Sequence, residues 1–547
     1  MRVALLSNVN IRAVCDELRK INGDLELYVP DGYGLWMQEL LGDNSPLVNF
    51  SPELLFLILD GSELIRGLSE GEVLGILDTI RSFVDKHTYL HLFVSELDVW
   101  CREILPNDVL SRGRLLEWEW NRRIYELSGQ RERVHVFKLK ELIEREGRKA
   151  FYSDKLWYLG GIRYSSYGSN VIAHEIDVLI RSYKRSRKKV LVLDLDNTLW
   201  GGVLGEVGLD DIELSDVKEG SRYKDFQRRV KELKDLGVLL AICSKNNESE
   251  VMEVFERHEH MVLKREDFVA MRINWEGKVR NIEEIASELN LALDSLVFVD
   301  DSPVERELVK RSLPCEVPEF PSDTSKLNDF AWDLYKRYFY VLKVSFEDVK
   351  RTEMYLQEKE RERLRREAVS LEDYLRSLGM RMKIKRLEEG DVRRAAELTQ
   401  RTNQFNLTNL RLTEAQVRER LSNPTYSAYI ASVEDRFGDN GKVLLAFVRK
   451  DVVNGIAEFE NLLMSCRVFG RYLEDQFVGF IEDELAEEGF KLIKARYVPT
   501  ARNKPAEDFF DRLGYKVVLL EGGEKLYELA LKDSRERKAF ADIEYEG

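Results

Sequence analysis

The sequence predicts an α/β protein of three domains, and three observations lead to this fold class. The chain has 547 residues, more than one hydrophobic core usually stabilises. Up to about residue 321, short apolar segments of strand length alternate with amphipathic helical segments, which is typical of parallel sheets covered by helices. After about residue 380 the order becomes helix, strands, helix, strand and helix, which indicates a separate, mixed α/β domain.

The domain boundaries follow from changes in this pattern. The first α/β domain covers residues 1–182, and a basic segment leads from it into the second α/β domain, residues 188–325. A charge-dense helical connector covers residues 326–379. The mixed domain covers residues 380–533, and a charged tail, which we expect to be mobile, covers residues 534–547.

Within the two α/β domains, apolar runs of four to six residues are bounded by helical patterns. In the first domain we expect strands at Arg2–Ser7, Leu54–Leu59 and Tyr89–Val94, and helices at Ile11–Ile21 and Glu70–Lys86. In the second domain we expect strands at Lys189–Asp194, Val238–Cys243 and Leu296–Val299, and a helix at Tyr223–Leu236.

The composition describes a folded protein and excludes two kinds of partner. The chain is 44% hydrophobic and 33% charged, and its formal net charge of −15 leaves no broad basic surface for nucleic acid. No apolar stretch approaches the roughly 18 residues needed to cross a membrane, and the N-terminal segment has the pattern of a strand and not of a secretory signal. Five cysteines without a CxxC pair predict a reduced, cytoplasmic protein.

Polar side chains follow the predicted strands of the second domain, at the point where each strand ends. Carboxyl ends of parallel strands meet at one edge of an open sheet, where ligands bind. We therefore expect one site to contain the residues at these ends and the lysine that opens a later helix: Asp194, Asp196, Ser244, Lys245, Lys278, Asp300 and Asp301.

These residue types suit phosphoryl transfer assisted by Mg²⁺, which prefers carboxylate oxygens and water. Asp194 is the candidate nucleophile, and Asp196 can donate a proton to the leaving oxygen and later take one from water. Ser244 and Lys278 supply a hydroxyl and a positive charge for the phosphoryl group. Metal ligands are expected among the four aspartates Asp194, Asp196, Asp300 and Asp301. Thr198 and Lys245 are candidates for substrate binding.

A strand-end aspartate can also simply cap the following helix, and we accept this simpler interpretation for Asp210 and Asp211. The combination of Asp194 with the later serine, lysine and aspartates argues against it for the predicted site. Only a short glycine-rich segment, residues 200–208, separates this site from the next helix. Because a large cap domain does not fit there, we expect an open site that suits a bulky or macromolecular substrate.

The motif Asp-x-Asp-x-Thr with the later serine, lysine and Asp-Asp resembles the haloacid dehalogenase (HAD) superfamily, and longer motifs narrow the resemblance to its FkbH-like family. The motifs in the second domain are residues 194–206, 244–247, 272–278 and 299–306, and those in the mixed domain are residues 400–408, 435–441, 465–471 and 497–500. The resemblance implies three domains: SGNH-hydrolase-like, Rossmann-like HAD without a large cap, and acetyltransferase-like (GNAT-like).

The same resemblance implies a function. Family members remove phosphate from 1,3-bisphosphoglycerate and load the glyceryl group as a thioester onto the phosphopantetheine thiol of an acyl carrier protein. The implied cofactor is Mg²⁺ and the implied partners are the carrier protein and a small phosphorylated donor. The residues at 194, 196, 244, 278, 300 and 301 match the family's phosphatase motif position by position.

Acyl transfer from a mixed anhydride would benefit from a protein thiol, and Cys466 is our candidate. It follows an apolar strand and precedes Arg467–Tyr472, which we expect to open a helix, so the helix N-terminus and two arginines would lower its pKa. An inert buried cysteine is an equally open interpretation. Arg467 is a candidate for binding the ligand's phosphate, although Tyr472 replaces the small residue of the acetyltransferase turn that holds a CoA pyrophosphate.

In the first domain, Ser7 follows the first strand, where SGNH hydrolases place their nucleophile. The matching Asp-x-x-His is missing, since Asp154 is followed by Trp157, and we expect His174 to pack on a helix. Without a histidine to take the serine proton we expect no hydrolysis and favour a docking or scaffolding role.

Two other functions stay open at this point. One is a phosphatase or acyltransferase acting on another phosphorylated metabolite, for instance in surface polysaccharide or lipid assembly. The other is a non-catalytic protein whose domains only bind partners, and the complete set of aspartates argues against it.

Overall fold

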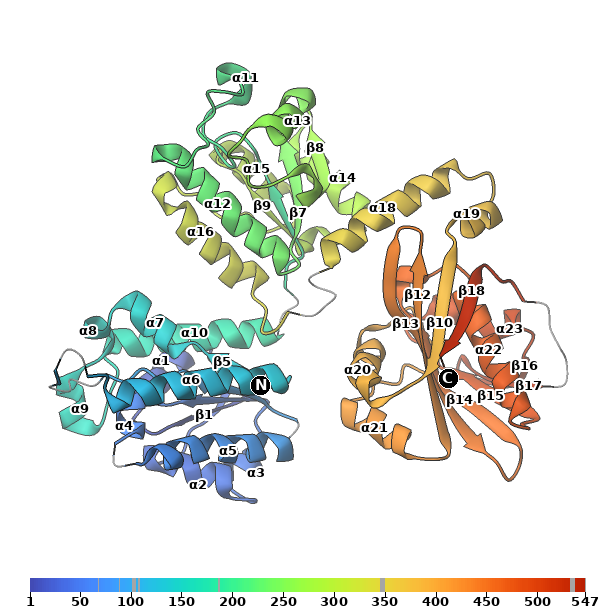
Figure 1. Ribbon diagram of the computed structural model, residues 1–547, viewed down its shortest axis with the longest axis horizontal. Helices are drawn as coiled ribbons and strands as arrows, with labels where there is room; N and C mark the ends of the chain where they lie inside the picture. Colours follow the sequence, from blue (N-terminus) through green and yellow to red (C-terminus); the bar gives the residue numbers. More distant parts are fainter. Residues whose placement is uncertain are drawn as a thin grey trace. The chain divides into compact units, whose positions relative to one another are not determined.

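A computed structural model gives the structure of the chain and describes residues 1–66, 68–87, 89–100, 105–106, 109–184, 187–344, 350–531 and 537–546. The chain divides into two compact units, residues 1–349 and 350–547. The predicted α/β fold class is confirmed, because the first unit contains two parallel sheets and the second contains a mixed sheet (Figure 1).

The first sheet has the strand order β2-β1-β3-β4-β5, and all its strands are parallel. Its strands are β1 (Arg2–Ser7), β2 (Glu26–Tyr28), β3 (Leu54–Ile58), β4 (His91–Ser95) and β5 (Val134–Phe137). The helices are α1 (Arg12–Ile21), α2 (Trp36–Leu41), α3 (Pro46–Phe50), α4 (Gly61–Leu64), α5 (Glu70–Lys86), α6 (Arg112–Gln130), α7 (Leu139–Glu146), α8 (Arg148–Phe151), α9 (Asp154–Gly160) and α10 (Ser166–Lys184).

Helices cover both faces of this sheet, which explains why its strands are continuously apolar. Alternate residues of β3 enter different cores: Leu55 and Leu57 pack with residues of α5 and α6, whereas Leu54 and Phe56 pack with residues of α1 and α10. A strand buried on both faces gains from an apolar residue at every position.

The second sheet has the order β8-β7-β6-β9 and is also parallel. Its strands are β6 (Val190–Leu193), β7 (Leu239–Ser244), β8 (Phe268–Ile273) and β9 (Leu296–Val299). The helices are α11 (Leu204–Val207), α12 (Lys218–Asp235), α13 (Glu248–Arg257), α14 (Lys278–Glu288), α15 (Pro303–Ser312) and α16 (Leu327–Leu334). Leu327, Phe330 and Leu334 of α16 belong to the core of this domain, so the first part of the predicted connector packs with the sheet.

The second unit contains a sheet of order β16-β17-β15-β14-β13-β12-β10-β18, with β11 paired to β14. The β14–β15 and β10–β18 pairs are parallel and the other pairs are antiparallel. The strands are β10 (Met380–Arg386), β11 (Phe405–Asn406), β12 (Tyr426–Asp435), β13 (Gly438–Asp451), β14 (Ile456–Met464), β15 (Leu492–Tyr497), β16 (Lys516–Glu521), β17 (Glu524–Ala530) and β18 (Ala541–Glu546). The helices are α18 (Arg351–Glu367), α19 (Leu371–Ser377), α20 (Val392–Arg401), α21 (Glu414–Ser422), α22 (Leu473–Glu487) and α23 (Phe509–Arg512).

Strand β18 corrects our expectation of a mobile C-terminal tail. Its residues pair with β10 in parallel, from Met380 opposite Ala541 to Lys385 opposite Glu546. The side chain of Gln476 on α22 fixes the start of the strand, because it donates to Ala541 O at 2.8 Å and accepts from Ala541 N at 3.0 Å. The backbone of β18 is thus held by the sheet edge although its side chains are largely exposed.

Candidate functional site

The carboxyl ends of β6, β7 and β9 lie side by side, as predicted. Leu193, the last residue of β6, pairs with Ile242 on one side and with Val299 on the other. Asp194 and Asp300 directly follow β6 and β9, and Ser244 is the last residue of β7. All three side chains are buried, so the sheet holds these polar groups away from bulk solvent.

Lys278 is the first residue of α14, and its side chain bonds to both Asp194 and Asp300. Its Nζ donates to Asp194 Oδ1 at 2.8 Å and also to Asp300 Oδ2. The lysine itself is only 4% exposed, and a buried ammonium is stable only when it is paired with negative charge. Ser302 N fixes the other oxygen of Asp300, Oδ1, at 2.8 Å.

The charges of this cluster are not balanced. One oxygen from each of Asp194, Asp300 and Asp301 lies within 4.8 Å of the others, whereas Lys278 brings a single positive charge. Burial raises the pKa of Asp194 to about 7, with Lys278 lowering it and Asp300 raising it further. Burial and the charge of Asp300 also raise the pKa of Asp301. Burial opposes the charge of Lys278, but the two aspartates outweigh this effect and raise its pKa.

This donor set fits a divalent cation. Three carboxylates around one point are the oxygen ligands that Mg²⁺ prefers, and a cation there would remove the excess negative charge. Among the described residues, these three aspartates are the group of histidine, cysteine or acidic side chains close enough together to hold a metal. Asp194, Asp300 and Asp301 are thus the residues that could coordinate the ion.

The carboxylate of Asp196, which we also predicted as a metal ligand, lies outside this group. Its Oδ1 accepts from Trp200 Nε1 at 3.0 Å and from Leu204 N at 3.1 Å. Its Oδ2 accepts from Asn246 Nδ2 at 3.0 Å. The role of Asp196 as a proton donor and acceptor stays a prediction, and these bonds orient its side chain.

Asn246 is a site residue that sequence reasoning missed. Besides Asp196, its amide contacts Ser244 Oγ at 3.2 Å, and the side chain is buried. It thus links the predicted proton donor to the predicted phosphate-binding serine. Its place two residues after Ser244, in a run of polar residues after an apolar strand, is the signal that could have indicated it.

The substrate-binding roles of Thr198 and Lys245 stay predictions, and the structure shows the surroundings of both side chains. Thr198 is 0% exposed, and its Oγ1 has no hydrogen-bond partner in the structure, so the hydroxyl does not face solvent. Lys245 is near the surface, where its Nζ pairs with Glu305 Oε1 at 2.6 Å. A phosphoryl group would have to compete with Glu305 for this lysine.

The predicted helix after Cys466 begins later than expected. Residues Cys466–Val468 form a 3-10 turn, and α22 starts only at Leu473, after Tyr472 with a φ of 58°. The prediction that the N-terminus of an α-helix activates this thiol is therefore wrong, because six residues separate Cys466 from Leu473, the start of α22. The alternative of a buried cysteine is also wrong, because Cys466 is exposed. The role of Cys466 as an acyl-carrying thiol stays a prediction.

The other described cysteines are buried, namely Cys15, Cys243 and Cys315, and Cys101 lies outside the described residues. Burial raises the pKa of these three thiols to about 11 or 12, which keeps them protonated and unreactive near neutral pH.

The two arginines next to Cys466 have different surroundings. Arg471 is buried, and its guanidinium contacts Asp435 Oδ2 at 3.0 Å. Arg361 also pairs with Asp435, at 2.8 Å. The charge of Arg471 is therefore paired with Asp435 inside the domain. Arg467 lies in the 3-10 turn and donates to Asn440 O at 3.4 Å.

The first domain contains the positions that correspond to the SGNH nucleophile and to the missing Asp-x-x-His. Ser7 ends β1 and is 4% exposed, with its Oγ accepting from Val9 N at 3.2 Å. Asp154 and Trp157 lie on α9. His174 lies on α10, as expected for a helical pattern, but it is exposed, so the prediction that it packs is wrong.

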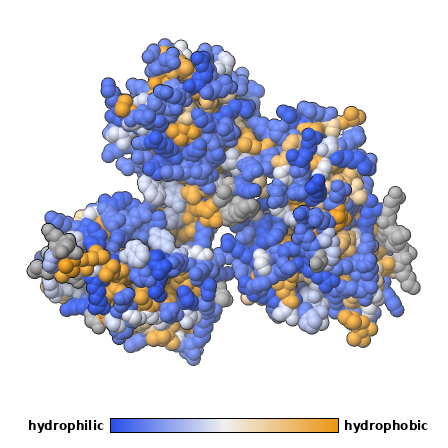
Figure 2. All heavy atoms as spheres, viewed as in Figure 1, coloured by the Kyte–Doolittle hydropathy of each residue, from blue (hydrophilic) through white to orange (hydrophobic). Residues whose placement is uncertain are grey.

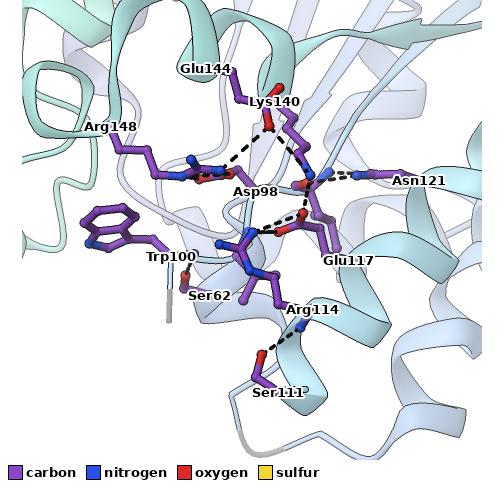
Figure 3. Close-up of polar contacts among 12 residues, drawn as sticks. Ser62, Asp98, Trp100, Ser111, Arg114, Glu117, Asn121, Lys140, Glu144 and Arg148 are labelled. Carbon is purple, nitrogen blue, oxygen red and sulfur yellow. Dashed lines mark hydrogen bonds and ion pairs between the residues drawn. The ribbon is translucent and has the colours of Figure 1, made fainter. Parts of the chain in front are cut away.

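Beyond β4 of the same sheet, a network of ion pairs surrounds two buried carboxylates (Figure 3). Arg148 Nε lies 3.2 Å from Asp98, and Arg114 and Lys140 both contact Glu117, whose Oε2 also accepts from Val99 N at 2.7 Å. Figure 3 shows these three basic side chains pointing toward the two acids. The network links the segment after β4, which contains Asp98 and Val99, to α6 and α8.

Comparison with known proteins supports the second domain as a phosphatase. Residues 189–350 match the family model described as NLI interacting factor-like phosphatase. The crystal structure of the N-terminal part of a Bacteroides fragilis protein, which contains a phosphatase domain complexed with Mg, is similar, with a TM-score of 0.57 and 26% identity. The likeness covers 63% of this chain and 94% of that chain. The chain carries a HAD-like phosphatase domain.

Other solved structures resemble part of the chain more distantly. The ribosomal-protein-alanine N-acetyltransferase of Escherichia coli has 14% identity and a TM-score of 0.22, over 29% of this chain and 99% of that chain. The spermidine/spermine N-acetyltransferase of Vibrio cholerae has 14% identity and a TM-score of 0.22, over 29% of this chain and 95% of that chain. No curated protein matches the chain. In the part of the chain that the structure describes, no helix has the length and apolar character required to span a bilayer.

Proposed function

We propose that the protein is a bifunctional enzyme: a Mg²⁺-dependent phosphatase that also loads a glyceryl group from 1,3-bisphosphoglycerate onto an acyl carrier protein. The observation that supports the phosphatase half most directly is the cluster of Asp194, Asp300 and Asp301 around Lys278. The similar Bacteroides phosphatase domain was solved with Mg, and the aspartate oxygens here suit the same ion. The transferase half rests on the resemblance to the FkbH-like family and on the exposed thiol of Cys466.

In the phosphatase half, Asp194 attacks phosphorus and the alcohol of the substrate leaves. Asp196 donates the proton that the leaving oxygen needs, and its bonds to Trp200 and Asn246 hold it for this task. Bound Mg²⁺ supplies positive charge for the phosphoryl oxygens, and Ser244 donates a hydrogen bond to them. Water then hydrolyses the phosphorylated aspartate, and Asp196 takes the proton from that water.

In the transferase half, the thiolate of Cys466 attacks the carbonyl carbon of the acyl phosphate. A C–S bond forms, the C–O bond to phosphate breaks, and inorganic phosphate leaves with the electron pair. The thiol of the carrier protein's phosphopantetheine arm then loses its proton to solvent, attacks the new thioester and takes the acyl group. Cys466 leaves as a thiolate, so the enzyme is regenerated without an oxidant or a reductant.

The experiment incubates the protein with 1,3-bisphosphoglycerate, Mg²⁺ and a holo-acyl carrier protein, and measures the carrier by intact mass spectrometry. We expect the mass of one glyceryl group on the carrier and released phosphate. Asp194→Asn should stop removal of the 3-phosphate, and a glyceryl group without phosphate on the carrier in this variant would contradict the nucleophile assignment.

Cys466→Ala tests the transferase half in the same assay. We expect no glyceryl carrier, whereas Cys315→Ala, which changes a buried cysteine of the other unit, should load the carrier normally. Loading that persists in Cys466→Ala would refute the thiol relay. Phosphate release without any mass shift in the parent protein would leave the phosphatase half alone standing and refute transfer to this carrier.

A further inference from the structure

An ion pair joins the segments that follow the two strands beside β6. In the order β8-β7-β6-β9, strand β6 lies between β7 and β9, and Asp194 directly follows β6. Lys245 directly follows β7, and Glu305 lies in the first turn of α15, the helix after β9. Lys245 Nζ donates to Glu305 Oε1 at 2.6 Å, so this contact reaches from one neighbour of β6 to the other. We call Lys245 and Glu305 the bridging pair.

Hydrogen bonds connect both members of the bridging pair to the phosphatase site. Asn246, the residue after the lysine, donates from its amide to Asp196 Oδ2 at 3.0 Å. On the other side, Ser302 Oγ accepts from the backbone N–H of the glutamate at 3.4 Å, and Ser302 N donates to Asp300 Oδ1 at 2.8 Å. The bridging pair is therefore adjacent to the predicted proton donor and to a candidate metal ligand.

The lysine of the bridging pair differs from two other basic side chains at this edge of the sheet. Lys278 is bonded to two of the aspartates, and Arg306 donates to the backbone oxygens of Asp300 and Asp301 at 2.9 and 2.7 Å. Both of these basic residues are buried. The side chain of Lys245, in contrast, is 40% exposed. Its ammonium group is thus within reach of a ligand that comes from solvent.

The glutamate of the bridging pair is not strongly held. In the part of the chain that the structure describes, Glu305 Oε2 is buried and has no hydrogen-bond partner. A buried acceptor without a partner costs free energy, which the carboxylate regains when it turns toward water. The other oxygen pairs with a partly exposed lysine, and ion pairs of this kind contribute little to stability. An anionic ligand can therefore replace Glu305 at small cost.

The burial of Asp194 decides how a substrate approaches. A phosphate ester brings its phosphoryl group to this carboxylate, so the rest of the molecule stays on the solvent side, where Lys245 is exposed. The visible face of the phosphatase domain in Figure 2 is mostly hydrophilic, with scattered apolar residues, and a surface of this kind selects ligands by charge and hydrogen bonds. A second anionic group on the same small molecule is held close by the bound phosphoryl group, so its contact with the lysine costs little further entropy.

We propose that Lys245 binds a second anionic group of the substrate, which takes the place of the Glu305 carboxylate. A phosphate ester without such a group leaves the bridging pair intact and gains no contact from it. The bridging pair thus makes the phosphatase selective for small phosphate esters that carry a further carboxylate or phosphate. This inference rests on the phosphatase half of the proposed function and names the class of its substrate.

The experiment compares phosphate release from 3-phosphoglycerate and from glycerol 3-phosphate, which has a hydroxymethyl group in place of the carboxylate. Both are measured with Mg²⁺ at low ionic strength. The parent protein should prefer 3-phosphoglycerate about tenfold or more in kcat/KM, because a hydrogen bond between charged groups is lost with the other substrate. Lys245→Met should remove this preference, mainly through a higher KM for 3-phosphoglycerate. Glu305→Gln should lower that KM about twofold to fivefold, because the competing carboxylate is gone.

Two exposed charges of α15 provide matched controls. Lys310→Met and Glu307→Gln make the same changes of charge outside the bridging pair, and both should keep the preference of the parent protein. Calorimetry with the Asp194→Asn variant measures the same selection as binding without turnover. In this background 3-phosphoglycerate should bind about tenfold more tightly than glycerol 3-phosphate, and added Lys245→Met should remove the difference.

Equal kcat/KM for the two substrates in the parent protein would overturn the inference, and so would a Lys245→Met variant that keeps the preference. A higher KM for 3-phosphoglycerate in Glu305→Gln would also refute it, because the glutamate would then orient the lysine and not compete for it. If the parent protein releases no phosphate from either substrate, the phosphatase half of the proposed function is wrong, and the calorimetric comparison still decides this inference.

Discussion

Replacement of Asp301 by asparagine should stabilise the metal-free phosphatase domain and abolish its stabilisation by Mg²⁺. The reason is the unbalanced charge of the cluster: the oxygens of Asp194, Asp300 and Asp301 lie within 4.8 Å of one another, with one lysine between two of them. Two like charges at this distance repel by about 3 kcal/mol at an effective dielectric constant of about 20. The asparagine removes one of these charges and keeps the size of the side chain.

The net gain is smaller than this repulsion, because Asp301 is partly exposed and Lys278 compensates one of the neighbouring charges. We expect about 1–2 kcal/mol in favour of the metal-free variant. In the parent protein, Mg²⁺ at about 100 times its dissociation constant should add about 2.7 kcal/mol, and this gain should vanish in Asp301→Asn. Removing the negative charge thus raises the stability of the metal-free domain and lowers its stability in the presence of Mg²⁺, relative to the parent protein.

Hydrogen–deuterium exchange of peptides from β6 and β9 measures this domain separately from the rest of the chain. With EDTA, exchange in Asp301→Asn should be about fivefold to thirtyfold slower than in the parent, and with Mg²⁺ the parent should be the slower of the two. The control Asp210→Asn, which removes an exposed charge of the same domain, should leave both rates unchanged. Faster exchange of Asp301→Asn in EDTA, or full protection of this variant by Mg²⁺, would refute the charge argument.

Three further predictions concern the pH dependence of Mg²⁺ binding, the buried ion pairs of Asp435 and the reactivity of the cysteines. Because burial raises the pKa of Asp194 to about 7, protons compete with Mg²⁺ for this carboxylate as the pH falls through 7. Calorimetry below pH 7 should therefore show weaker Mg²⁺ binding that is accompanied by proton release. A Mg²⁺ affinity that does not change between pH 6 and 8 would contradict this prediction. Asp435→Ala should destabilise the second unit by about 3–5 kcal/mol, since it leaves Arg361 and Arg471 buried without their shared carboxylate, and urea unfolding monitored by exchange in β12 checks it. Iodoacetamide should alkylate Cys466 in the native protein but not the buried Cys243, and peptide mass mapping that finds the reverse would contradict this prediction.

Much of the first unit could be predicted from the sequence because its signals are local. The apolar run at Arg2–Ser7 and the amphipathic helix at Glu70–Lys86 have the bounds that we expected, and the strand before Asp194 ends within one residue of the expected position. In parallel sheets covered on both faces, strands are continuously apolar and helices have a repeating apolar stripe, so short windows contain the information.

The second unit was harder to predict at the edges of its sheet. Strand β18 has mostly exposed side chains, and it is held by its backbone pairing with β10, by Gln476 and by contacts of Tyr545 with Phe480 and Glu484. The alternation of Ala541, Ile543 and Tyr545 with acidic residues is a strand signal that the expectation of a charged tail overlooked. Likewise, the helix after Cys466 starts at Leu473 because Tyr472 takes a left-handed backbone conformation, which residue types alone did not indicate.

The sequence by itself determined which residue types meet at the phosphatase site. Asp194, Ser244 and Asp300 end adjacent parallel strands, and strand topology brings such ends to one edge whatever the details of packing. It did not determine where each side chain points. Only the tertiary structure shows that Asp196 is held by Asn246, because that direction depends on bonds between residues far apart in the sequence.

The ion pairing and the exposure of the site residues are likewise decided only by the tertiary structure. The tertiary structure decides that Lys245 pairs with Glu305, that the hydroxyl of Thr198 is buried, and that Trp275 is exposed. The residue types of a site follow from strand order and local pattern. The pairing, burial and exposure of each group depend on partners that folding alone brings together, because electrostatic and packing energies act over a few ångströms of space and not along the chain.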